Sequence, residues 1–381
     1  MTKPLLSAKN DIVLGRQIAL AAAFLLPVSK LLEAPSILAQ YAGGDIILPA
    51  LFHFLLQAGV LAVILFAASR SKKSLFERLE RLLGKGVSIV YILYALYFVY
   101  AAILPLLDLE KFVYAAFFDT SPTTFTFVFF FPLCAFICVK GLKSLGRAAD
   151  ISLFLFLLPF LALIAMSFAE TDFSHLLPLF GSKFGGTMSA FTKTTPHFSD
   201  AILLLPLIGN YRYEKRDGMK IMAGYGVGAL LSLFFFAVFF GVYSSIAPRE
   251  HYAFAKIAQY FPALSIIGRA DLLFVYLLTV VLLIFTCMPL QYTTDLFCHA
   301  CHIQKRVLPS AVLNLALFFF VFYCNKYYNS FYAVISGKLG FVFWIFADIL
   351  PLLLLLLPKY SEGEKETQRV PAPHKKEKRR A

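Results

Sequence analysis

The amino-acid sequence predicts an all-α protein that crosses a membrane about ten times. Of its 381 residues, 60% are hydrophobic and 15% are charged, whereas an average soluble domain has about 45–50% apolar and about 25% charged residues. The apolar residues, which include 42 Phe, gather in runs of roughly 20, the length that a helix needs to cross a hydrocarbon core of about 30 Å. These observations exclude a soluble enzyme, a disordered chain and a secreted disulfide scaffold.

Ten apolar segments along the chain are predicted to span the membrane. They cover residues 14–42, 46–68, 86–108, 123–140, 151–169, 185–211, 219–246, 271–294, 307–324 and 331–358. The membrane domain then runs over residues 14–358, between an N-terminal tail over 1–13 and a basic tail over 359–381. Because residues 1–11 are polar and no small-residue cleavage site closes the first apolar run, no cleaved signal peptide is predicted.

The charges predict the orientation of the chain. Lys and Arg number 35 and Asp and Glu number 22, which gives a net charge of +13. If both termini are cytoplasmic, 26 of the Lys and Arg fall in cytoplasmic tails and loops and eight fall on the other side. Because short cytoplasmic loops collect Lys and Arg, this distribution favours cytoplasmic termini. The basic run over 375–380 is then predicted to lie beside anionic lipid, and nucleic-acid binding is the less favoured alternative.

Two connections between spans are amphipathic. Residues 71–83 place Leu75, Phe76 and Leu79 at helical spacing opposite charged residues, which predicts a short helix in the inner membrane interface. Residues 247–269 are also amphipathic and are predicted to cap the outer face. Neither connection has a catalytic pattern, so packing and anchoring are the expected roles of both.

The first predicted span is interrupted near its middle. It contains the polar residues Ser29, Lys30 and Glu33 between Pro27 and Pro35. A proline removes a backbone donor and weakens a helix, and a charged residue costs about 2.5–3.5 kcal/mol to insert at the centre of a membrane. Lys30 and Glu33 are three positions apart, so one interpretation is a neutral pair that holds the bundle together. The alternative is a site linked to a ligand or a proton.

The sixth predicted span repeats this pattern. Its middle holds six candidate site residues, which are Thr195, Pro196, His197, Phe198, Ser199 and Asp200. Polar side chains and a proline at membrane depth are typical of a broken helix that lines a cavity. Counted from Gly15 and Gly185, Pro27 and Pro196 fall at nearly equal offsets. Broken helices at corresponding positions of two five-span halves indicate the central site of a transporter.

Such breaks suit a ligand that carries both charges, as an amino acid does. Free backbone N–H groups at the start of a half-helix attract a carboxylate, and free carbonyl groups attract an ammonium. His197 or Asp200 is expected to hold a proton or the amine of the ligand, unless both are hydrogen-bonded core residues. Tyr94 and Tyr97 in the third span are predicted to form aromatic walls of the pocket.

Other chemistry has little support in the sequence. Cys298-His-Ala-Cys301-His302 has the spacing of a c-type haem attachment site, but its loop is predicted to be cytoplasmic, and its two His are poorly spaced for a tetrahedral zinc site. We therefore predict no ligand there, and no cofactor or metal site is expected. Phosphate-binding and hydrolase motifs are absent from the sequence, so an enzyme is not expected.

Several strings occur in an order and spacing that together resemble one family. They are residues 35–45 (PSILAQYAGGD), 91–100, 121–123 (SPT), 140–150, Leu177-Pro178 followed by Phe198-Ser-Asp200, and Ile267-Gly-Arg269-Ala-Asp271. With ten spans, this order resembles the spore-germination permease-like proteins, the B subunits of germinant receptors, within the amino acid–polyamine–organocation superfamily. The resemblance extends from about residue 17 to 358.

The resemblance implies a five-plus-five inverted repeat with a ligand between broken first and sixth helices. It also implies a receptor for small nutrients such as amino acids in the spore inner membrane, with a large A subunit and a C-subunit lipoprotein as partners. The chain departs from the superfamily at Val28-Ser29-Lys30, where small Gly-rich backbone is usual. Lys30 is therefore expected to occupy a cation subsite, which argues against coupling to sodium. Ile46-Ile47 also replaces an aromatic residue that often follows Gly44-Asp45.

We therefore expect a germinant-receptor subunit whose ligand shifts an inward/outward equilibrium by binding at residues 27–33 and 196–200. Two alternatives stay open. One is a proton-coupled amino acid transporter that acts alone. The other is a structural subunit whose site is vestigial because Lys30 occupies it.

Overall fold

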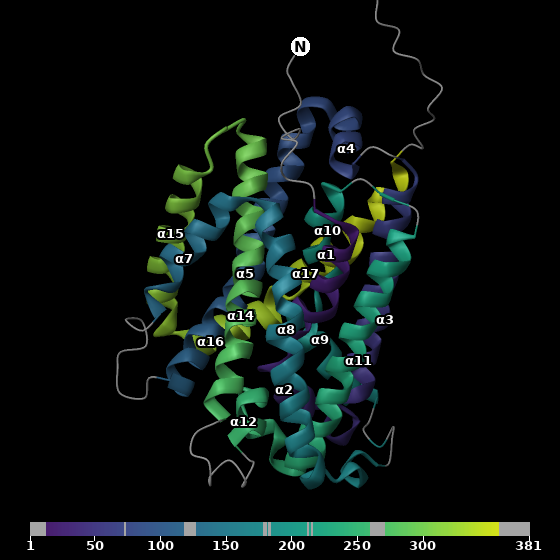
Figure 1. The fold of residues 1–381 in the computed structure, drawn as a ribbon, viewed down its shortest axis with the longest axis vertical. Helices are drawn as coiled ribbons and strands as arrows, with labels where there is room; N and C mark the ends of the chain where they lie inside the picture. Colours follow the sequence, from purple (N-terminus) through teal and green to yellow (C-terminus); the bar gives the residue numbers. More distant parts are fainter. Residues whose placement is uncertain are drawn as a thin grey trace, which may run out of the picture.

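The chain is helical throughout the residues that the computed structural model describes. These are residues 13–71, 74–117, 127–177, 181, 184–211, 213, 214, 216–259 and 271–357. Within these ranges no strand occurs, and the helices run mostly along one long axis (Figure 1). The predicted all-α class is confirmed. The predicted tails over 1–13 and 359–381 lie outside the described residues, except for Val13.

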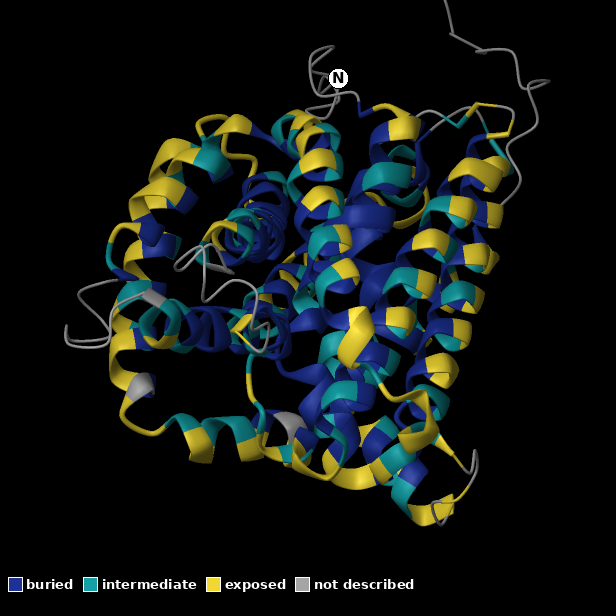
Figure 2. Ribbon diagram, turned by 60° about the horizontal axis from the view of Figure 1, so that its bottom comes forward, coloured by how far each residue is buried: buried dark blue, intermediate teal, exposed yellow. Residues whose placement is uncertain are grey.

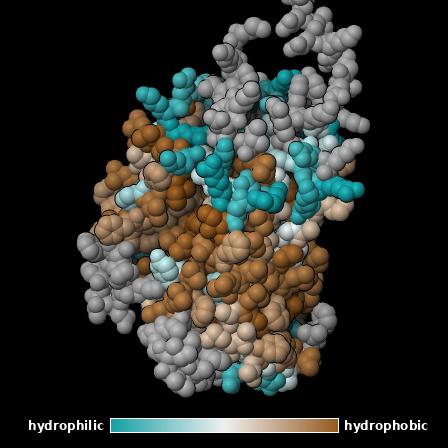
Figure 3. All heavy atoms as spheres, in the orientation of Figure 1, coloured by the Kyte–Doolittle hydropathy of each residue, from teal (hydrophilic) through white to brown (hydrophobic). Residues whose placement is uncertain are grey.

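An apolar belt covers the middle of the face of the molecule that Figure 3 shows. Figure 3 shows a broad band of hydrophobic side chains below a cap of hydrophilic ones, with a second hydrophilic group at the opposite end. Six helical segments of the described chain are long and apolar enough to cross a membrane, and a bent pair adds a seventh if it counts as one span. The chain is therefore a multi-pass membrane protein. The count of ten spans and the inverted repeat stay predictions.

The first predicted span is broken, as expected. It consists of α1 (Gly15–Leu20), a π-helical turn η1 (Ala21–Leu25), a 3-10 turn η2 (Pro27–Leu31) and α2 (Ala34–Ala42). The helix axis bends by 62° between η2 and α2. Pro27 and Pro35 each stand in the first turn of a helical piece, where a backbone donor has no helical partner to lose.

The sixth predicted span is broken as well. Helix α9 (Phe184–Thr194) is followed by the 3-10 turn η7 (Thr195–Phe198) and by α10 (Asp200–Gly209). Between them Ser199 has φ −79° and ψ 55°, outside the helical region. Turns η2 and η7 contact each other, so the two breaks meet inside the bundle.

Seven predicted spans are continuous helices in the described chain. They are α3 (Ile47–Ser69), α5 (Val87–Phe117), α7 (Phe130–Lys140), α8 (Leu142–Ser167), α11 (Asp217–Tyr243), α14 (Asp271–Ala300) and α15 (Val307–Asn325). Helix α8 begins well before the predicted residue 151 and includes Asp150. The reason is that Asp150 is paired, because it lies 3.0 Å from Arg16 and accepts a hydrogen bond from Gln17 at 2.8 Å.

The tenth predicted span, which was expected to be one helix, is interrupted. It comprises α16 (Tyr328–Ala333), the π-helical η9 (Val334–Lys338), α17 (Phe341–Phe343), the π-helical η10 (Trp344–Ile349) and the 3-10 helix η11 (Leu350–Leu356). Pro351 stands at the start of η11. Because proline has no N–H to donate to the preceding turn, the regular α-helical ladder cannot continue there.

Both amphipathic connections contain helix. Helix α4 (Leu75–Leu83) is capped by Ser74, whose hydroxyl accepts a backbone hydrogen bond at 3.2 Å, and it lies at the top of the bundle in the view of Figure 1. At the opposite end, η8 (Ser244–Arg249) and α12 (Ala253–Gln259) pack against α2 and α14. Residues 260–270 of the predicted outer cap lie outside the described residues.

Helix α11 packs directly against the first broken span. Figure 2 shows buried residues on the inner faces of the helices and exposed residues on their outer faces. A Cβ atom at Gly224 or Gly228 of α11 would collide with the carbonyl oxygens of Ala19 and Ala22. Glycine at these two positions thus lets the backbones of α11 and the first span touch. Short 3-10 turns complete the fold, namely η3 (Gly43–Asp45), η4 (Gly84–Gly86), η5 (Phe168–Glu170) and η6 (Phe173–Leu176).

Candidate ligand site

A buried ion pair joins the two broken helices. Nζ of Lys30 lies 2.6 Å from Oδ1 of Asp200, and the two side chains are 1% and 4% exposed. The same Nζ donates a hydrogen bond to the Leu26 carbonyl at 3.2 Å, and the Tyr225 hydroxyl donates to Oδ2 of Asp200 at 3.4 Å. Because an unpaired buried charge costs several kcal/mol, each member of the pair keeps the other in place.

The local backbone favours this arrangement. Asp200 is the first residue of α10, where the positive end of the helix stabilises a carboxylate. One backbone N–H at this helix start, that of Ala201, donates to Oε1 of Gln57 at 3.0 Å. Nε2 of Gln57 in turn donates to Oδ1 of Asp348 at 2.6 Å. This chain of hydrogen bonds connects the second break to α3 and η10.

Aromatic rings pack beside the ion pair. The Phe198 ring centroid lies 5.6 Å from Nζ of Lys30, within the range of a cation–π interaction. The His53 ring of α3 stacks on Phe198 with 4.5 Å between the centroids, and its Nε2 lies 2.7 Å from the Phe191 carbonyl oxygen. Turn η7 is therefore clamped to α3.

A small cavity of about 30 Å³ lies beside the pair. Its lining residues come from both breaks and from α5, α14 and α17, and they are Ser29, Tyr97, Ala101, Leu104, Pro105, Pro196, His197, Ser199, Asp200, Leu203, Phe285, Pro289 and Phe343. Nε2 of His197 is buried and has no hydrogen-bond partner among the described residues. A cavity of this size holds one or two water molecules. An amino acid therefore fits only if the two breaks move apart.

The structure brings most of the predicted site residues together. Ser29, Lys30, Tyr97, Pro196, His197, Phe198, Ser199 and Asp200 form the pair, its aromatic support or the cavity wall. The Thr195 hydroxyl instead donates to the Phe191 carbonyl at 3.1 Å, and Pro27 packs beside Gly228 of α11. That these residues bind a ligand stays a prediction.

Glu33 is not part of this group. Its Oε2 lies 2.8 Å from Nδ1 of His251, so the predicted pairing of Glu33 with Lys30 is wrong. Turn η2 ends before Glu33, and the two residues do not share a helical face. The backbone N–H of Ala253 also donates to the Leu32 carbonyl at 3.0 Å. The outer connection thus closes over the first break through two contacts.

Tyr94 lies on the other side of an aromatic wall. Its ring packs against Phe346 with centroids 5.8 Å apart, and Phe346 stacks on Tyr97 at 5.1 Å. Only Tyr97 of the two tyrosines lines the small cavity. Tyr94 faces a separate apolar cavity, so the prediction that both form walls of one pocket is half right.

Four polar residues of the site were missed from the sequence. His53, Gln57 and Asp348 are polar side chains within long apolar runs, and the free-energy cost of inserting such groups into a membrane could have indicated them. Tyr225 gives no comparable signal, because a tyrosine is common at many positions of a membrane helix. Its role follows only from the fold, which sets its hydroxyl beside Asp200.

The cysteine-rich string shows no built metal site. Cys298 is buried at the end of α14, whereas Cys301 is exposed beyond it. In the described part of the chain, no three His, Cys, Asp or Glu side chains are grouped so that they could hold a metal ion.

Two broken helices thus meet at a buried ion pair inside the apolar bundle of a multi-pass membrane protein. The sequence model of a family described as spore germination protein matches residues 20–330. The chain belongs to this family of spore germination proteins, so the family resemblance is confirmed, and the wider superfamily stays a prediction. A search among curated proteins gives no match.

The ion pair makes a prediction for stability. We expect Lys30→Met and Asp200→Leu each to lower the free energy of unfolding by about 3–5 kcal/mol, because each leaves a buried charge unpaired. The double variant should lose less than the sum of the single losses.

Unfolding of the purified protein in detergent measures these free energies, with Arg16→Met as control. Arg16 belongs to an ion pair in which it is 70% exposed, so its loss should cost about 0–1 kcal/mol. Additive losses in the double variant would refute the coupling.

The contact between His251 and Glu33 makes a prediction for pH dependence. The hydrogen bond to the Glu33 carboxylate raises the pKa of His251, burial opposes this, and Glu250 and Asp108 also favour the charged imidazole. A raised pKa means that the contribution to stability is complete below about pH 6.5. It is lost as the pH rises through the pKa of the folded state.

His251→Gln should therefore destabilise the protein more at pH 5.5 than at pH 9. Thermal unfolding of both forms across this range gives the difference. His175→Gln is the control. Nδ1 of His175 lies 3.2 Å from the Gly241 carbonyl oxygen, and its Nε2 lies 3.9 Å from Oδ2 of Asp172 with side chains that are 41% and 59% exposed, so this contact should contribute little at either pH. A loss at His251 that is constant with pH contradicts the charged contact.

Proposed function

We propose that this spore germination protein binds a small zwitterionic nutrient, such as an amino acid, between its two helix breaks as the membrane subunit of a germinant receptor. The observation that carries the proposal is the buried contact of 2.6 Å between Lys30 and Asp200. It sets one positive and one negative group side by side at the place where two half-helices meet. An amino acid carries the two complementary charges.

Binding is proposed to proceed by exchange of charge partners. The ligand carboxylate replaces Asp200 beside Lys30, and the ligand ammonium takes the place of Lys30 beside Asp200. Each buried charge keeps a partner of opposite sign, so the exchange avoids the large cost of an unpaired ion. The N–H groups at the start of α10 and the unpartnered Nε2 of His197 add polar contacts to the ligand.

This exchange requires the protein to open. The present cavity of about 30 Å³ excludes an amino acid, so the ligand must bind a conformation in which η2 and η7 are further apart. A ligand shifts such an equilibrium by its difference in affinity for the two states. Partner subunits could then respond to the change in shape, which is the behaviour of a receptor.

The proposed setting follows from the family and the charges. Family membership supports a place in the spore inner membrane with an A subunit and a C subunit as partners. The distribution of 26 cytoplasmic against eight external Lys and Arg supports cytoplasmic termini.

Variants of the pair test the proposal in spores. In spores whose own copy is replaced, Lys30→Met and Asp200→Asn should raise the amino acid concentration for half-maximal germination at least about tenfold. The reason is that a hydrogen bond to a charged group contributes about 1.5–3 kcal/mol. Immunoblots of spore membranes confirm equal protein levels. Arg16→Met is the control and should germinate normally.

An unchanged germination response in both variants would overturn this site. It would favour the second candidate, a structural subunit with a vestigial site. The specific observation behind that candidate is that the Lys30 side chain itself occupies the space between the breaks.

Uptake separates a receptor from a transporter that acts alone. In proteoliposomes that contain only this chain, we expect no accumulation of radiolabelled amino acid above protein-free vesicles when a proton gradient is applied. The amino acid used is one that triggers germination in the assay above. Accumulation that collapses with an uncoupler would instead establish a proton-coupled transporter.

A further inference from the structure

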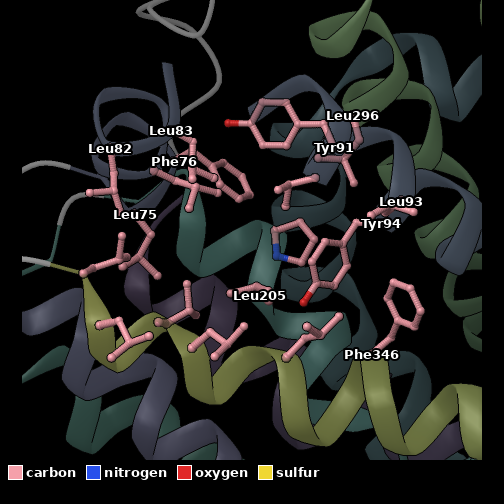
Figure 4. A pocket seen from close by; sticks show the side chains of 18 of the residues that line it. Leu75, Phe76, Leu82, Leu83, Tyr91, Leu93, Tyr94, Leu205, Leu296 and Phe346 are labelled. Carbon is pink, nitrogen blue, oxygen red and sulfur yellow. The ribbon is translucent and has the colours of Figure 1, made fainter. Parts of the chain in front are cut away.

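A second, larger cavity lies beneath the amphipathic helix α4. Its volume is about 330 Å³, and its walls come from α4, α5, α10, α14, η10 and η11. Every lining residue is Leu, Phe, Val, Pro or Tyr. Figure 4 shows side chains of Phe76, Leu205 and Phe346 converging on this space from three different elements. The volume is in the range of about 300–1,000 Å³ that small-molecule sites have.

The cavity opens at the surface of the apolar belt. Five of its lining leucines are also among the exposed ones, with Leu82 at 54%, Leu83 at 42%, Leu93 at 47%, Leu353 at 55% and Leu356 at 75%. Leu93 lies within a segment long and apolar enough to cross the membrane. Exposed leucines on such a segment face the lipid, so the mouth of the cavity faces acyl chains.

The rim of the cavity is basic. Nη1 of Arg70 donates to the Leu355 carbonyl at 3.0 Å, and Nη2 of Arg78 lies 3.4 Å from the carbonyl oxygen of Leu357. Both arginines thus hold the end of η11, whose leucines form one wall. Of the described residues between 70 and 85, four are Lys or Arg (Arg70, Arg78, Arg81 and Lys85) and two are Glu. Arg81 and Lys85 are exposed, so this excess of positive charge stands beside the apolar wall.

We propose that the cavity binds an acyl chain of an anionic phospholipid from the leaflet at this end of the molecule. The chain lies under α4, and the phosphate lies at the basic rim. Two features on different residues support this occupant. The apolar walls offer a charged nutrient no partner, and the basic rim attracts anionic headgroups. This site is separate from the nutrient site and does not depend on it.

The lipid site shares a wall with the nutrient site. Tyr94 and Phe346 line the larger cavity, and Phe346 stacks on Tyr97, which lines the small one. An acyl chain in the larger cavity therefore presses on the aromatic layer that backs the ion pair. Lipid composition is expected to change how easily the two breaks separate.

Photolabelling in nanodiscs tests the proposal. The full chain is placed in phosphatidylcholine nanodiscs with traces of phosphatidylglycerol that carries a photoreactive group on one acyl chain, and labelled residues are mapped by mass spectrometry. In the wild type, labels should concentrate on residues 75–98 and 350–357. In Leu93→Trp the labelling there should fall at least about fivefold, because the indole occupies the cavity. Leu96→Trp, one turn along the same helix, 63% exposed and outside the lining, should keep it.

Each other outcome overturns a defined part of the proposal. Equal labelling in Leu93→Trp and Leu96→Trp, or wild-type labels spread evenly onto α15, refutes the site. A photoreactive phosphatidylcholine that labels as strongly as phosphatidylglycerol refutes the role of the basic rim. A free fatty acid probe that labels the cavity while phosphatidylglycerol does not refutes the phospholipid as occupant. Wild-type mapping stands without any variant, and thermal unfolding shows that both variants are folded.

Discussion

The contact between Lys30 and Asp200 is the constraint on which the rest of the structure depends. Two buried ions, 1% and 4% exposed, stay charged at low cost only while they are paired, so this contact holds two interrupted helices together at one point. The surrounding residues hold the two breaks in this position. Phe198 and Tyr225 surround the charges, and Gln57 links the start of α10 to the last span. Without this contact, nothing would offset the free-energy cost of the two helix breaks.

The fold class and the positions of both breaks could be predicted from sequence, because they depend on residues that violate a hydrophobic background. Pro27, Lys30, Pro196 and Asp200 are such residues, and each stands at a break. The partner of each charge could not be predicted. Spacing along the chain favoured Glu33 for Lys30, whereas the fold brings in a residue 170 positions away.

The last span has one signal of its interruptions in the sequence, which is Pro351 at the start of η11. The other residues from Leu350 to Leu356 are leucine, which fits an α-helix, a 3-10 helix and a lipid-facing surface equally well. Tyr94 and Tyr97 illustrate the same limit. They are three positions apart on α5, yet they face different cavities, because helix packing rather than sequence spacing decides which cavity each ring lines.

The two glycines of α11 bear on how the two charges can separate. Because Gly224 and Gly228 let the backbone of α11 touch that of Ala19 and Ala22, the first span lies against α11 without the layer of side chains that usually separates two helices. A shift of the first span along α11 would bring its carbonyl groups against larger neighbours of these glycines. We therefore expect a separation of Lys30 and Asp200 to begin at the second break.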